Sequence, residues 1–303
     1  QLLLEFIGAC LSNVKGWRMK KALFMYGAGD TGKSRLKCLV EQLLGRGNYV
    51  GIDLREIEAR FGTGLIYGMR LAGSSDMSFI TVDELKTFKK CTGGDSIFAE
   101  FKGQNGFEFT FNGLFWFCMN QLPRFGGDDG QWVHDRIMQV HCRNAIPIAK
   151  QDRLLGEKLY AERDGIVRKA VHALRAVIQN GYRFTEPQSV LSAREEYMVE
   201  NNSVLAFHAE CMMKRPEGVK CSEVTTGQVY RIYQAWCRLN NNGFAKTARE
   251  FRTTLARYYK TDFSSMTIRR SYGNVYRDLL LRPEALQEYT GFWSSPEDDF
   301  LKD

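Results

Sequence analysis

Apolar runs alternate with glycine-rich turns from residue 22 to about residue 150. Short apolar runs between turn residues predict buried strands, whereas apolar residues three and four positions apart predict amphipathic helices. This pattern predicts strands at 22–26, 66–72, 107–111, 114–119 and 136–141. A helical period follows over 153–182, and another helix opens at 186–189. Strands alternating with helices indicate an α/β fold in which helices flank a sheet.

Both ends of the chain have a more helical pattern. Residues 1–20 hold a short apolar helix followed by basic residues. After Asn201–Ser203, three helical stretches precede a segment, 262–276, that could form two strands. We therefore expect an N-terminal segment at 1–20, a core domain at 21–202 and a smaller domain at 203–303. Because the chain begins with Gln1 rather than Met, we expect the first segment to end a longer upstream region.

The composition adds only weak indications of the protein's partners and cellular compartment. The chain has 303 residues, a net charge of +7 and eight cysteines. The basic excess is a weak indication of a polyanionic partner. No cysteines form a C-x-x-C pair and the four histidines are not spaced with them as zinc ligands, so we expect free thiols in a reducing compartment, the cytoplasm of a host cell. We recognise no signal peptide and no apolar run of about 18 residues, and therefore expect no membrane partner.

Residues 27–34 carry the most informative chemistry. They read Gly-Ala-Gly-Asp-Thr-Gly-Lys-Ser, a complete G-x-x-x-x-G-K-[ST] pattern between a predicted strand and a predicted helix. In a phosphate-binding loop, backbone N–H groups surround the phosphates and the helix dipole favours their charge. We expect Lys33 to reach the β- and γ-phosphates of ATP, and the Ser34 hydroxyl to bind Mg²⁺. The other loop residues expected at the nucleotide are Gly27, Gly29, Asp30, Thr31 and Gly32.

Such a loop also needs an acidic residue at the end of a neighbouring strand, to hold Mg²⁺ or its water. Two positions compete: Asp76, and the pair Asp83 and Glu84. Thr81 and Glu84 have the spacing of a capping box, which gives Glu84 a structural explanation. We therefore favour Asp76 and keep the pair as the alternative.

Three later positions add to the candidate site. Residues 102–106 place glycine and asparagine between alternating stretches, which predicts a hairpin tip that exposes Lys102. The strand at 114–119 is followed by Asn120, and a polar side chain at the carboxyl end of a buried strand can orient a water at the γ-phosphate. Arg136 stands at the start of the last predicted strand.

The order of these motifs resembles that of the superfamily 3 helicases, and more narrowly the primase-helicase proteins of poxviruses, phages and plasmids. The chain has the phosphate loop, the acidic strand end, L-K-x-x-K-K-x-T-G-G-D at 85–95, E-x-K-G at 100–103, N-x-L-P-x-F at 120–125, and then an arginine. The resemblance covers about 20 to 200 and continues more weakly beyond. It implies an AAA+ type ATPase that assembles as a ring, usually a hexamer, and moves along single-stranded DNA.

The resemblance also implies roles for single residues. The family's nucleotide-site positions match Lys33, Ser34, Asp76 and Asn120. Arg136 matches the arginine finger given to the neighbouring subunit's nucleotide, and Lys102 matches the channel lysine that contacts DNA. Lys89 and Lys90 lie in the family's additional motif, the one at 85–95 between the acidic strand end and Asn120, and are further candidates for DNA contact. The family often has two acids, or Ser-Glu, where Ser75-Asp76 stands here, so the water-activating base stays open, with Asp83 or Glu84 as possible contributors.

The C-terminal region offers a second candidate contact with DNA. The stretch 245–257 combines an apolar face with Lys246, Arg249, Arg252 and Arg257, as a recognition helix does. Three more arginines, Arg269, Arg270 and Arg277, lie in or after the predicted two-stranded element, where they could contact phosphate. The region resembles the winged-helix module that follows the ATPase in phage and poxvirus proteins. A small helical domain with a basic outer face is the alternative.

Three functions compete on these grounds. The first is an ATP-driven replicative DNA helicase of a phage or mobile genetic element, acting on forked DNA. The second is an origin-binding initiator whose ATPase controls assembly and melting. The third is a small-molecule kinase. It is disfavoured because the sequence has a strand ending in Asn120, an arginine at 136 and a hairpin at 102–106, and offers no recognisable substrate pocket or lid.

Overall fold

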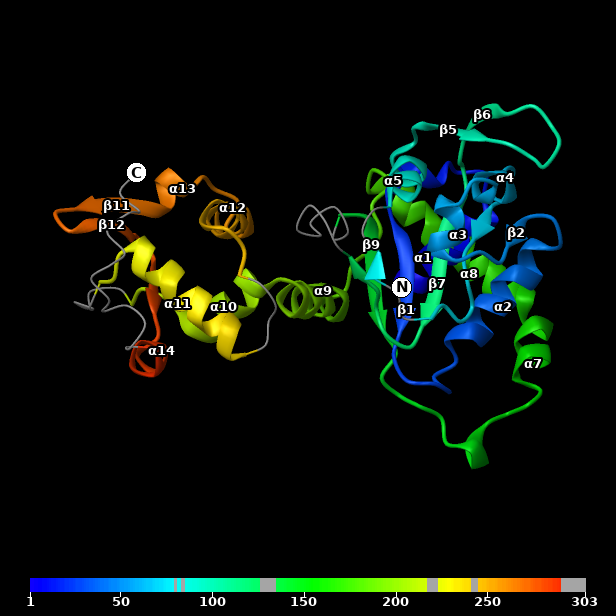
Figure 1. The fold of residues 1–303 in the computed structure, drawn as a ribbon. Helices are drawn as coiled ribbons and strands as arrows, with labels where there is room; N and C mark the ends of the chain where they lie inside the picture. The colour runs from blue at the N-terminus through cyan, green and yellow to red at the C-terminus, as the bar shows by residue number, and fades with distance from the viewer. Residues whose placement is uncertain (79–80, 83–84, 126–134, 217–222, 241–244, 290–303) are drawn as a thin grey trace. The chain divides into compact units, whose positions relative to one another are not determined.

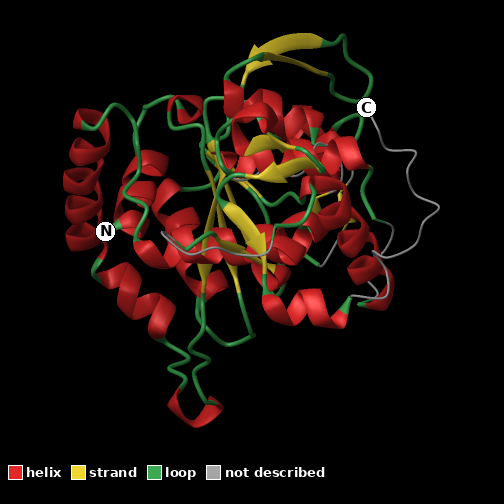
Figure 2. Ribbon diagram, turned by 90° about the vertical axis from the view of Figure 1, so that its left-hand side faces the viewer, coloured by secondary structure: helices red, strands yellow, loops and turns green. Residues whose placement is uncertain are grey.

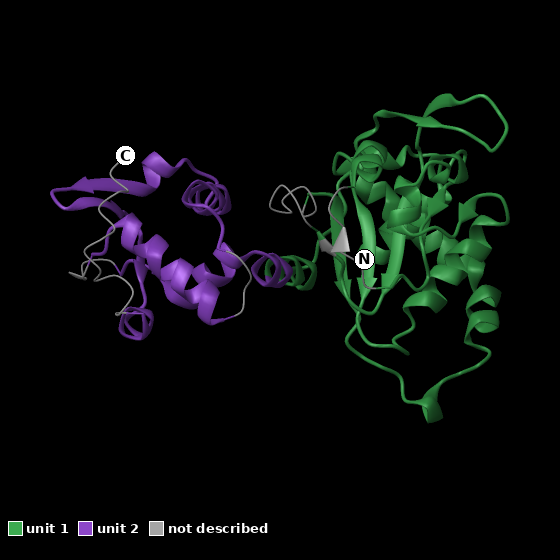
Figure 3. Cartoon of the chain, viewed as in Figure 1, with its two compact units in different colours: residues 1–195 green, residues 196–303 purple. Residues whose placement is uncertain are grey.

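The computed structural model describes residues 1–78, 81–82, 85–125, 135–216, 223–240 and 245–289. The chain forms two compact units, residues 1–195 and 196–303 (Figure 3). The sequence pattern predicts a boundary after residue 202, whereas the division between the two units falls inside helix α9 (Gln188–Asn201). Over the described residues, no helix has both the length and the apolar composition needed to cross a bilayer.

The first unit is built on a sheet of five parallel strands (Figure 1). Their order is β2 (Tyr49–Val50), β3 (Leu71–Ala72), β7 (Leu114–Met119), β1 (Ala22–Tyr26) and β9 (Ile137–His141). Because all five run in one direction, their carboxyl ends share one edge of the sheet. The predicted α/β class with a flanked sheet is therefore confirmed. Of the predicted strand at 66–72 only 71–72 is β-structure, because α4 (Gly62–Leu65) and a turn lead up to it.

Alternation along the central strands separates two apolar cores. Leu23 and Met25 face one core, and Phe24 faces the other. The first core is closed by α1 (Leu2–Leu11), α2 (Lys33–Leu44) and α8 (Arg163–Gln179). The second is closed by α3 (Leu54–Glu58) and α5 (Lys86–Gly93). Figure 2 shows the strands of the sheet, in yellow, among helices, in red.

Helix α1 belongs to the first core. The ring of Phe6 meets that of Trp116 of β7 edge to face, with centroids 5.7 Å apart. The carboxylate of Glu5 is fully buried and accepts hydrogen bonds from the backbone N–H and the hydroxyl of Thr185. The η1 turn (Gly16–Arg18) then leads into β1. Residues 1–20 are thus packed into the same unit as the sheet.

An antiparallel hairpin, β5 (Ser96–Ala99) and β6 (Phe107–Thr110), stands out from the first unit (Figure 1). Residues 100–106 form its loop and include the predicted tip. The strand predicted at 107–111 therefore pairs within this hairpin and not with the main sheet. Since β6 leads directly to the first residue of β7, the hairpin lies at the amino edge of the sheet.

The capping box predicted for Thr81 and Glu84 is wrong. Thr81 lies in β4 (Thr81–Val82), which pairs with β8 (Arg124–Phe125), and α5 begins only at Lys86. The carboxylate of Glu58 instead accepts two backbone N–H groups in the first turn of α5, those of Thr87 and Phe88. A side chain from α3 thus supplies the cap that the local sequence was expected to supply. Glu84 lies outside the described residues.

The rest of the first unit follows β9. A segment containing the η3 turn (Ile148–Lys150) runs away from the sheet and returns (Figure 1). The helix predicted at 153–182 is two helices, α7 (Leu155–Ala161) and α8, which meet at Glu162.

The second unit packs three helices, α10 (Ser203–Cys211), α11 (Thr226–Leu239) and α12 (Ala248–Tyr258), around a core of its own. Phe207, Tyr233, Trp236 and Phe251 are at its centre. After α13 (Phe263–Met266) comes the hairpin β11 (Thr267–Arg270) and β12 (Gly273–Tyr276), within the predicted two-stranded segment. The unit also contains the pair β10 (Met212–Lys214) and β13 (Leu279–Leu281), and α14 (Pro283–Glu288).

Candidate functional site

The glycine-rich loop joins β1 to α2 at the carboxyl edge of the sheet. Gly27 has φ +131°, and a Cβ placed on it would lie 2.3 Å from the carbonyl oxygen of Cys142. Gly32, the residue before α2, has φ +85°, which L-residues rarely adopt. Around Gly29 the space is open, and a Cβ placed there would meet no atom within 4 Å. The loop backbone is therefore fixed at its two ends and accessible in its middle.

Lys33 is buried and its ammonium group lies inside the loop. Nζ donates to the carbonyl oxygens of Gly27 (2.8 Å) and Ala28 (2.6 Å) and to Oγ1 of Thr31 (3.1 Å). Phosphate oxygens form stronger, charge-assisted hydrogen bonds with an ammonium than carbonyl oxygens do. The lysine is thus held where a phosphate lying on the loop would meet it.

Ser34 connects the loop to the acidic turn that follows β3. Its Oγ donates to the carbonyl oxygen of Ser75, 2.7 Å away, which places Ser34 one residue from Asp76. Asp76 is exposed, and its backbone N–H donates to Oγ of Ser74 (3.3 Å). The two side chains assigned to Mg²⁺ therefore come from adjoining segments. The alternative acids, Asp83 and Glu84, lie outside the described residues.

Asn120 follows β7 directly and completes this edge. Its carbonyl oxygen accepts the backbone N–H of Gly27, 3.2 Å away. Lys33, Ser34, Asp76 and Asn120 thus lie at the carboxyl ends of three neighbouring strands. A hydroxyl and a carboxylate are hard oxygen ligands, and Mg²⁺ sites usually combine one or two of these with phosphate and water. The described residues contain no cluster of three or more His, Cys, Asp or Glu that could hold a metal alone.

Arg136 and Lys102 lie at the opposite edge of the sheet. Arg136 precedes Ile137, which pairs with Ala22, the first residue of β1. The glycine loop begins after the last residue of β1, so about 15 Å of strand separates Arg136 from it, at roughly 3.3 Å per residue. Arg136 is half-buried, and its Nε donates to Oγ1 of Thr92 (3.1 Å). Within one chain the structure therefore does not bring Arg136 to the loop.

The three lysines assigned to DNA have different surroundings. Lys102 is exposed in the loop of the β5–β6 hairpin. Lys89 and Lys90 are half-buried on α5. Of the three, Lys102 is the one whose position leaves its ammonium open to a large anionic ligand.

The sequence pattern does not single out Lys37, one turn along α2 from Lys33. Lysine is rarely buried, so a surface position is expected, yet Lys37 is 1% exposed. Its Nζ forms an ion pair with Glu41 and lies 3.5 Å from Oγ of Ser75. The available signal was the pair of opposite charges four residues apart.

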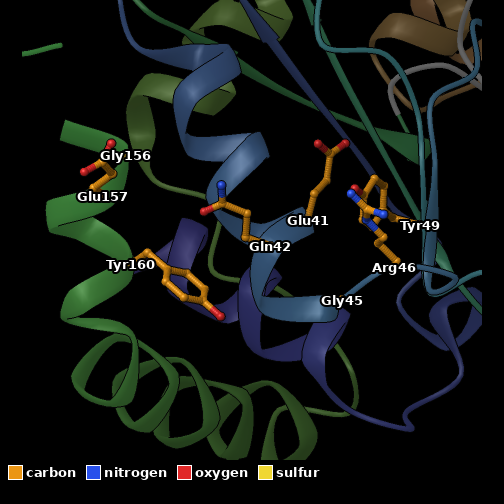
Figure 4. Close-up of a pocket in the computed structure, with 8 residues that line it drawn as sticks. All are labelled: Glu41, Gln42, Gly45, Arg46, Tyr49, Gly156, Glu157 and Tyr160. Carbon is orange, nitrogen blue, oxygen red and sulfur yellow. The ribbon is translucent and has the colours of Figure 1, made fainter. Parts of the chain in front are cut away.

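A groove of about 500 Å³ opens near the far end of α2, away from the glycine loop (Figure 4). Figure 4 shows Gln42 and Glu41 of α2 on one side and Tyr160 of α7 on the other. Its lining residues are Glu41, Gln42, Gly45, Arg46, Tyr49, Gly156, Glu157 and Tyr160. None of the predicted site residues that the structure describes lines it, so it is separate from the site at the sheet edge.

In the second unit, α12 buries its predicted apolar face and exposes basic residues. Phe251 and Leu255 are in the core, whereas Arg249 and Arg257 are exposed. Arg270 of the β11–β12 hairpin forms two hydrogen bonds with the carboxylate of Glu223, which also accepts from Tyr272. These bonds, that from Arg270 first, lower the pKa of Glu223 to about 2. Arg270 therefore has a structural partner, which counts against the predicted phosphate contact at this position.

The first unit is thus a parallel α/β fold with a glycine-rich phosphate-loop sequence and an acidic turn at the carboxyl edge of its sheet. Residues 25–136 match a family model described as a family of unknown function, DUF5906. Residues 199–287 match a model described as Poxvirus D5 protein-like. Each of these two models covers less than half of the chain. No curated protein matches the chain.

Several solved structures are distantly similar. An apo form of the NrS-1 C-terminal region is 10% identical, with 92% of this chain and 71% of that chain covered and a TM-score of 0.48. A second apo structure of that region is 13% identical, with 92% and 76% covered and a TM-score of 0.42. The JCV helicase, solved with a bound acetamide compound, is 15% identical, with 77% and 64% covered and a TM-score of 0.30. Likenesses this distant do not transfer a function.

Proposed function

We propose that this protein is an ATP-driven replicative DNA helicase of a phage or mobile genetic element, working as a ring of identical subunits on single-stranded DNA. The observation that carries the proposal is the common edge shared by Lys33, Ser34, Asp76 and Asn120. A phosphate loop, an oxygen-ligand pair and a polar strand end are the parts that phosphoryl transfer from ATP to water requires. The Poxvirus D5 protein-like match supports the choice of a DNA motor over other ATPases.

Each residue would have a defined task in hydrolysis. Lys33 would exchange the loop carbonyls for the β- and γ-phosphate oxygens. Ser34 and Asp76 would hold Mg²⁺, which neutralises charge on the transferred phosphoryl group. Asn120 would orient the water whose oxygen attacks the γ-phosphorus as the bond to the β–γ bridging oxygen breaks. Holding water and phosphate in line is itself a large part of such catalysis.

The remaining assignments concern other subunits and DNA. Arg136 lies at the opposite edge from its own glycine loop, which supports a role at the nucleotide of a neighbouring subunit. The exposed position of Lys102 on a projecting hairpin supports contact with DNA phosphates in a ring channel. The same proposal includes three further parts: the ring is a hexamer, the second unit is a winged-helix domain, and the protein is located in the cytoplasm of the host cell. The free thiols among the described cysteines support the last.

The test compares ATP hydrolysis and strand separation in matched variants. The wild-type protein should hydrolyse ATP, faster with single-stranded DNA, and should unwind a forked duplex. Lys33→Ala should abolish both activities, whereas Lys158→Ala, at an exposed lysine on α7, should retain them. Unwinding by Lys33→Ala would contradict the proposal. Particle images with an ATP analogue and single-stranded DNA should show rings with density in the channel. Images that show only monomers would contradict the proposed ring.

An origin-binding initiator is the second candidate, because α12 exposes Arg249 and Arg257 on the face opposite its buried residues. A selection from random duplexes separates the two functions. Enrichment of one sequence, lost in Arg249→Ala, would favour the initiator. Unwinding of forks without any sequence preference would favour the helicase.

A further inference from the structure

Lys37 is in an unusual place for a lysine. Lysine is almost never fully buried unless it is paired, and Lys37 is 1% exposed, on the face of α2 that also carries Lys33 and Val40. The helix repeat places residues four and seven apart on one side, so Lys37 follows Lys33 directly into the core. The surrounding core includes Met25 of β1 and Cys118 of β7.

The charge of Lys37 is balanced within the core. Its Nζ pairs with the carboxylate of Glu41, which is itself largely buried. Burial raises the pKa of the nearby Cys118 thiol to about 12, so this thiol is uncharged at neutral pH. Glu41 is therefore the group that neutralises Lys37. Replacing a buried ion pair of this kind by apolar residues is often neutral for stability or stabilising, so stability alone is a weak reason for this one.

The other contact of Lys37 leads to the acidic turn. Nζ lies 3.5 Å from Oγ of Ser75, and Oγ of Ser34 donates to the carbonyl oxygen of the same residue (2.7 Å). Ser75 is thus held by two side chains that lie about one turn apart on α2. Asp76, the next residue, is exposed and depends on this turn for its position.

We propose that Lys37, neutralised by Glu41, is a positioning residue for the nucleotide site. Through Ser75 it fixes Asp76 at a constant distance from Ser34, so that the two proposed Mg²⁺ ligands stay in place while Lys33 exchanges partners. The inference rests on the proposed function, since it names the residue that holds the proposed Mg²⁺ ligands in position. A shift of about 1 Å in such an arrangement can lower a rate by about 10²-fold.

The experiment uses the whole chain and five variants. Lys37→Met keeps the length of the side chain, and Lys37→Met combined with Glu41→Gln removes both buried charges, so that neither is left unpaired. Lys37→Arg keeps the charge, and Ser75→Ala removes the hydroxyl that Lys37 approaches but keeps the carbonyl that Ser34 holds. Lys158→Met is the matched control, because this lysine pairs with Asp152 but its side chain is 63% exposed.

Four measurements are made on each variant: thermal unfolding, binding of a fluorescent ATP analogue without divalent metal, Mn²⁺ binding to the ADP complex by electron paramagnetic resonance, and kcat for ATP hydrolysis. The double variant should unfold at the wild-type temperature, and its affinity for the nucleotide without metal should stay within about twofold of wild type. It should bind Mn²⁺ roughly tenfold more weakly, and its kcat for ATP should fall by about tenfold to hundredfold. Ser75→Ala removes the same contact from its other side, so it should lower Mn²⁺ affinity and kcat to a similar extent. Lys37→Arg should restore part of the metal affinity, and the control should match wild type.

Two results would overturn the inference. One is wild-type Mn²⁺ affinity in the double variant. The other is a parallel loss of unfolding temperature, nucleotide binding and metal binding in both Lys37 variants that lack the charge, which would make Lys37 a packing residue only. If wild type hydrolysed no ATP, the proposed function would fail, but the Mn²⁺ measurement would still decide the role of Lys37.

Discussion

The three glycines of the phosphate loop should differ sharply when each is changed to alanine. At Gly27 a Cβ would lie 2.3 Å from the carbonyl oxygen of Cys142, and the residue has φ +131°. At Gly32 the Cβ would meet nothing within 4 Å, but φ is +85°. At Gly29 neither obstacle exists. The sequence pattern treats the three alike, whereas the structure ranks them.

The structure also gives the size of each effect on the free energy of unfolding. Backbone strain costs about 1–3 kcal/mol at a conformation reserved for glycine, and a forced steric overlap costs about 1–3 kcal/mol, so Gly27→Ala should cost about 2–6 kcal/mol. Gly32→Ala should cost about 1–2 kcal/mol for its positive φ. Gly29→Ala should change stability by no more than about 1 kcal/mol, in either direction. In a unit of 195 residues, each kcal/mol lowers the unfolding temperature by about 2–4 °C.

Stability and nucleotide binding should separate in this series. The methyl group at Gly29→Ala would enter the open space in which phosphates would lie on the loop, so nucleotide affinity should fall by about tenfold to hundredfold, the value of one charge-assisted hydrogen bond. Thermal unfolding and titration with a fluorescent ATP analogue measure the two quantities. The reasoning would be refuted if Gly27→Ala unfolded at the wild-type temperature, or if Gly29→Ala were the least stable of the three.

Three further predictions concern the opposite edge of the sheet and the second unit. Arg136→Ala should leave ATP-analogue binding within about twofold but lower hydrolysis by about 10³-fold or more, as expected for an arginine acting in trans; lost binding would contradict that role. Lys102→Ala should reduce hydrolysis stimulated by single-stranded DNA while basal hydrolysis stays near wild type, and equal loss of both would remove the channel role. The pKa of Glu223 is lowered from 4.5 to about 2, so its bonds stabilise the folded second unit above about pH 4.5 and are lost as the pH falls toward 2. Glu223→Gln should flatten that part of the unfolding profile, and an unchanged slope would mean that other groups cause it.

Two of the predicted strands, β1 and β7, have a strong local signal. β1 and β7 are runs of five and six residues in which nearly every side chain is buried, and glycine or asparagine ends each run. β2 and β3 are two residues long, too short for any period to show, and they exist because β3 pairs with β7. Short strands of this kind are set by tertiary pairing, which a local pattern does not contain.

The site divides in the same way. Asp76 and Asn120 were placed at the ends of predicted strands, and in the structure they follow β3 and β7 at the carboxyl edge, because parallel strands bring their ends together. The sequence was not enough for Lys37, since a pattern of apolar and polar residues assigns every lysine to the surface. The cap of α5 was missed for a related reason: its acceptor, Glu58, is 29 residues from Thr87 along the chain.

The structure also limits how hydrolysis could be converted into movement. The glycine loop and Asn120 lie at one end of β7, and the hairpin with Lys102 joins the other end. No residue of β7 is more than 2% exposed, so this strand, about 20 Å long, is packed on both faces and has no room to bend. A change at the γ-phosphate would therefore reach the base of the hairpin without any bending of β7 itself. In the proposed ring, movement of Lys102 against DNA would then come either from the first unit moving as a whole or from the segments that join the hairpin to α5 and β7, which are the places where a hinge has to be sought.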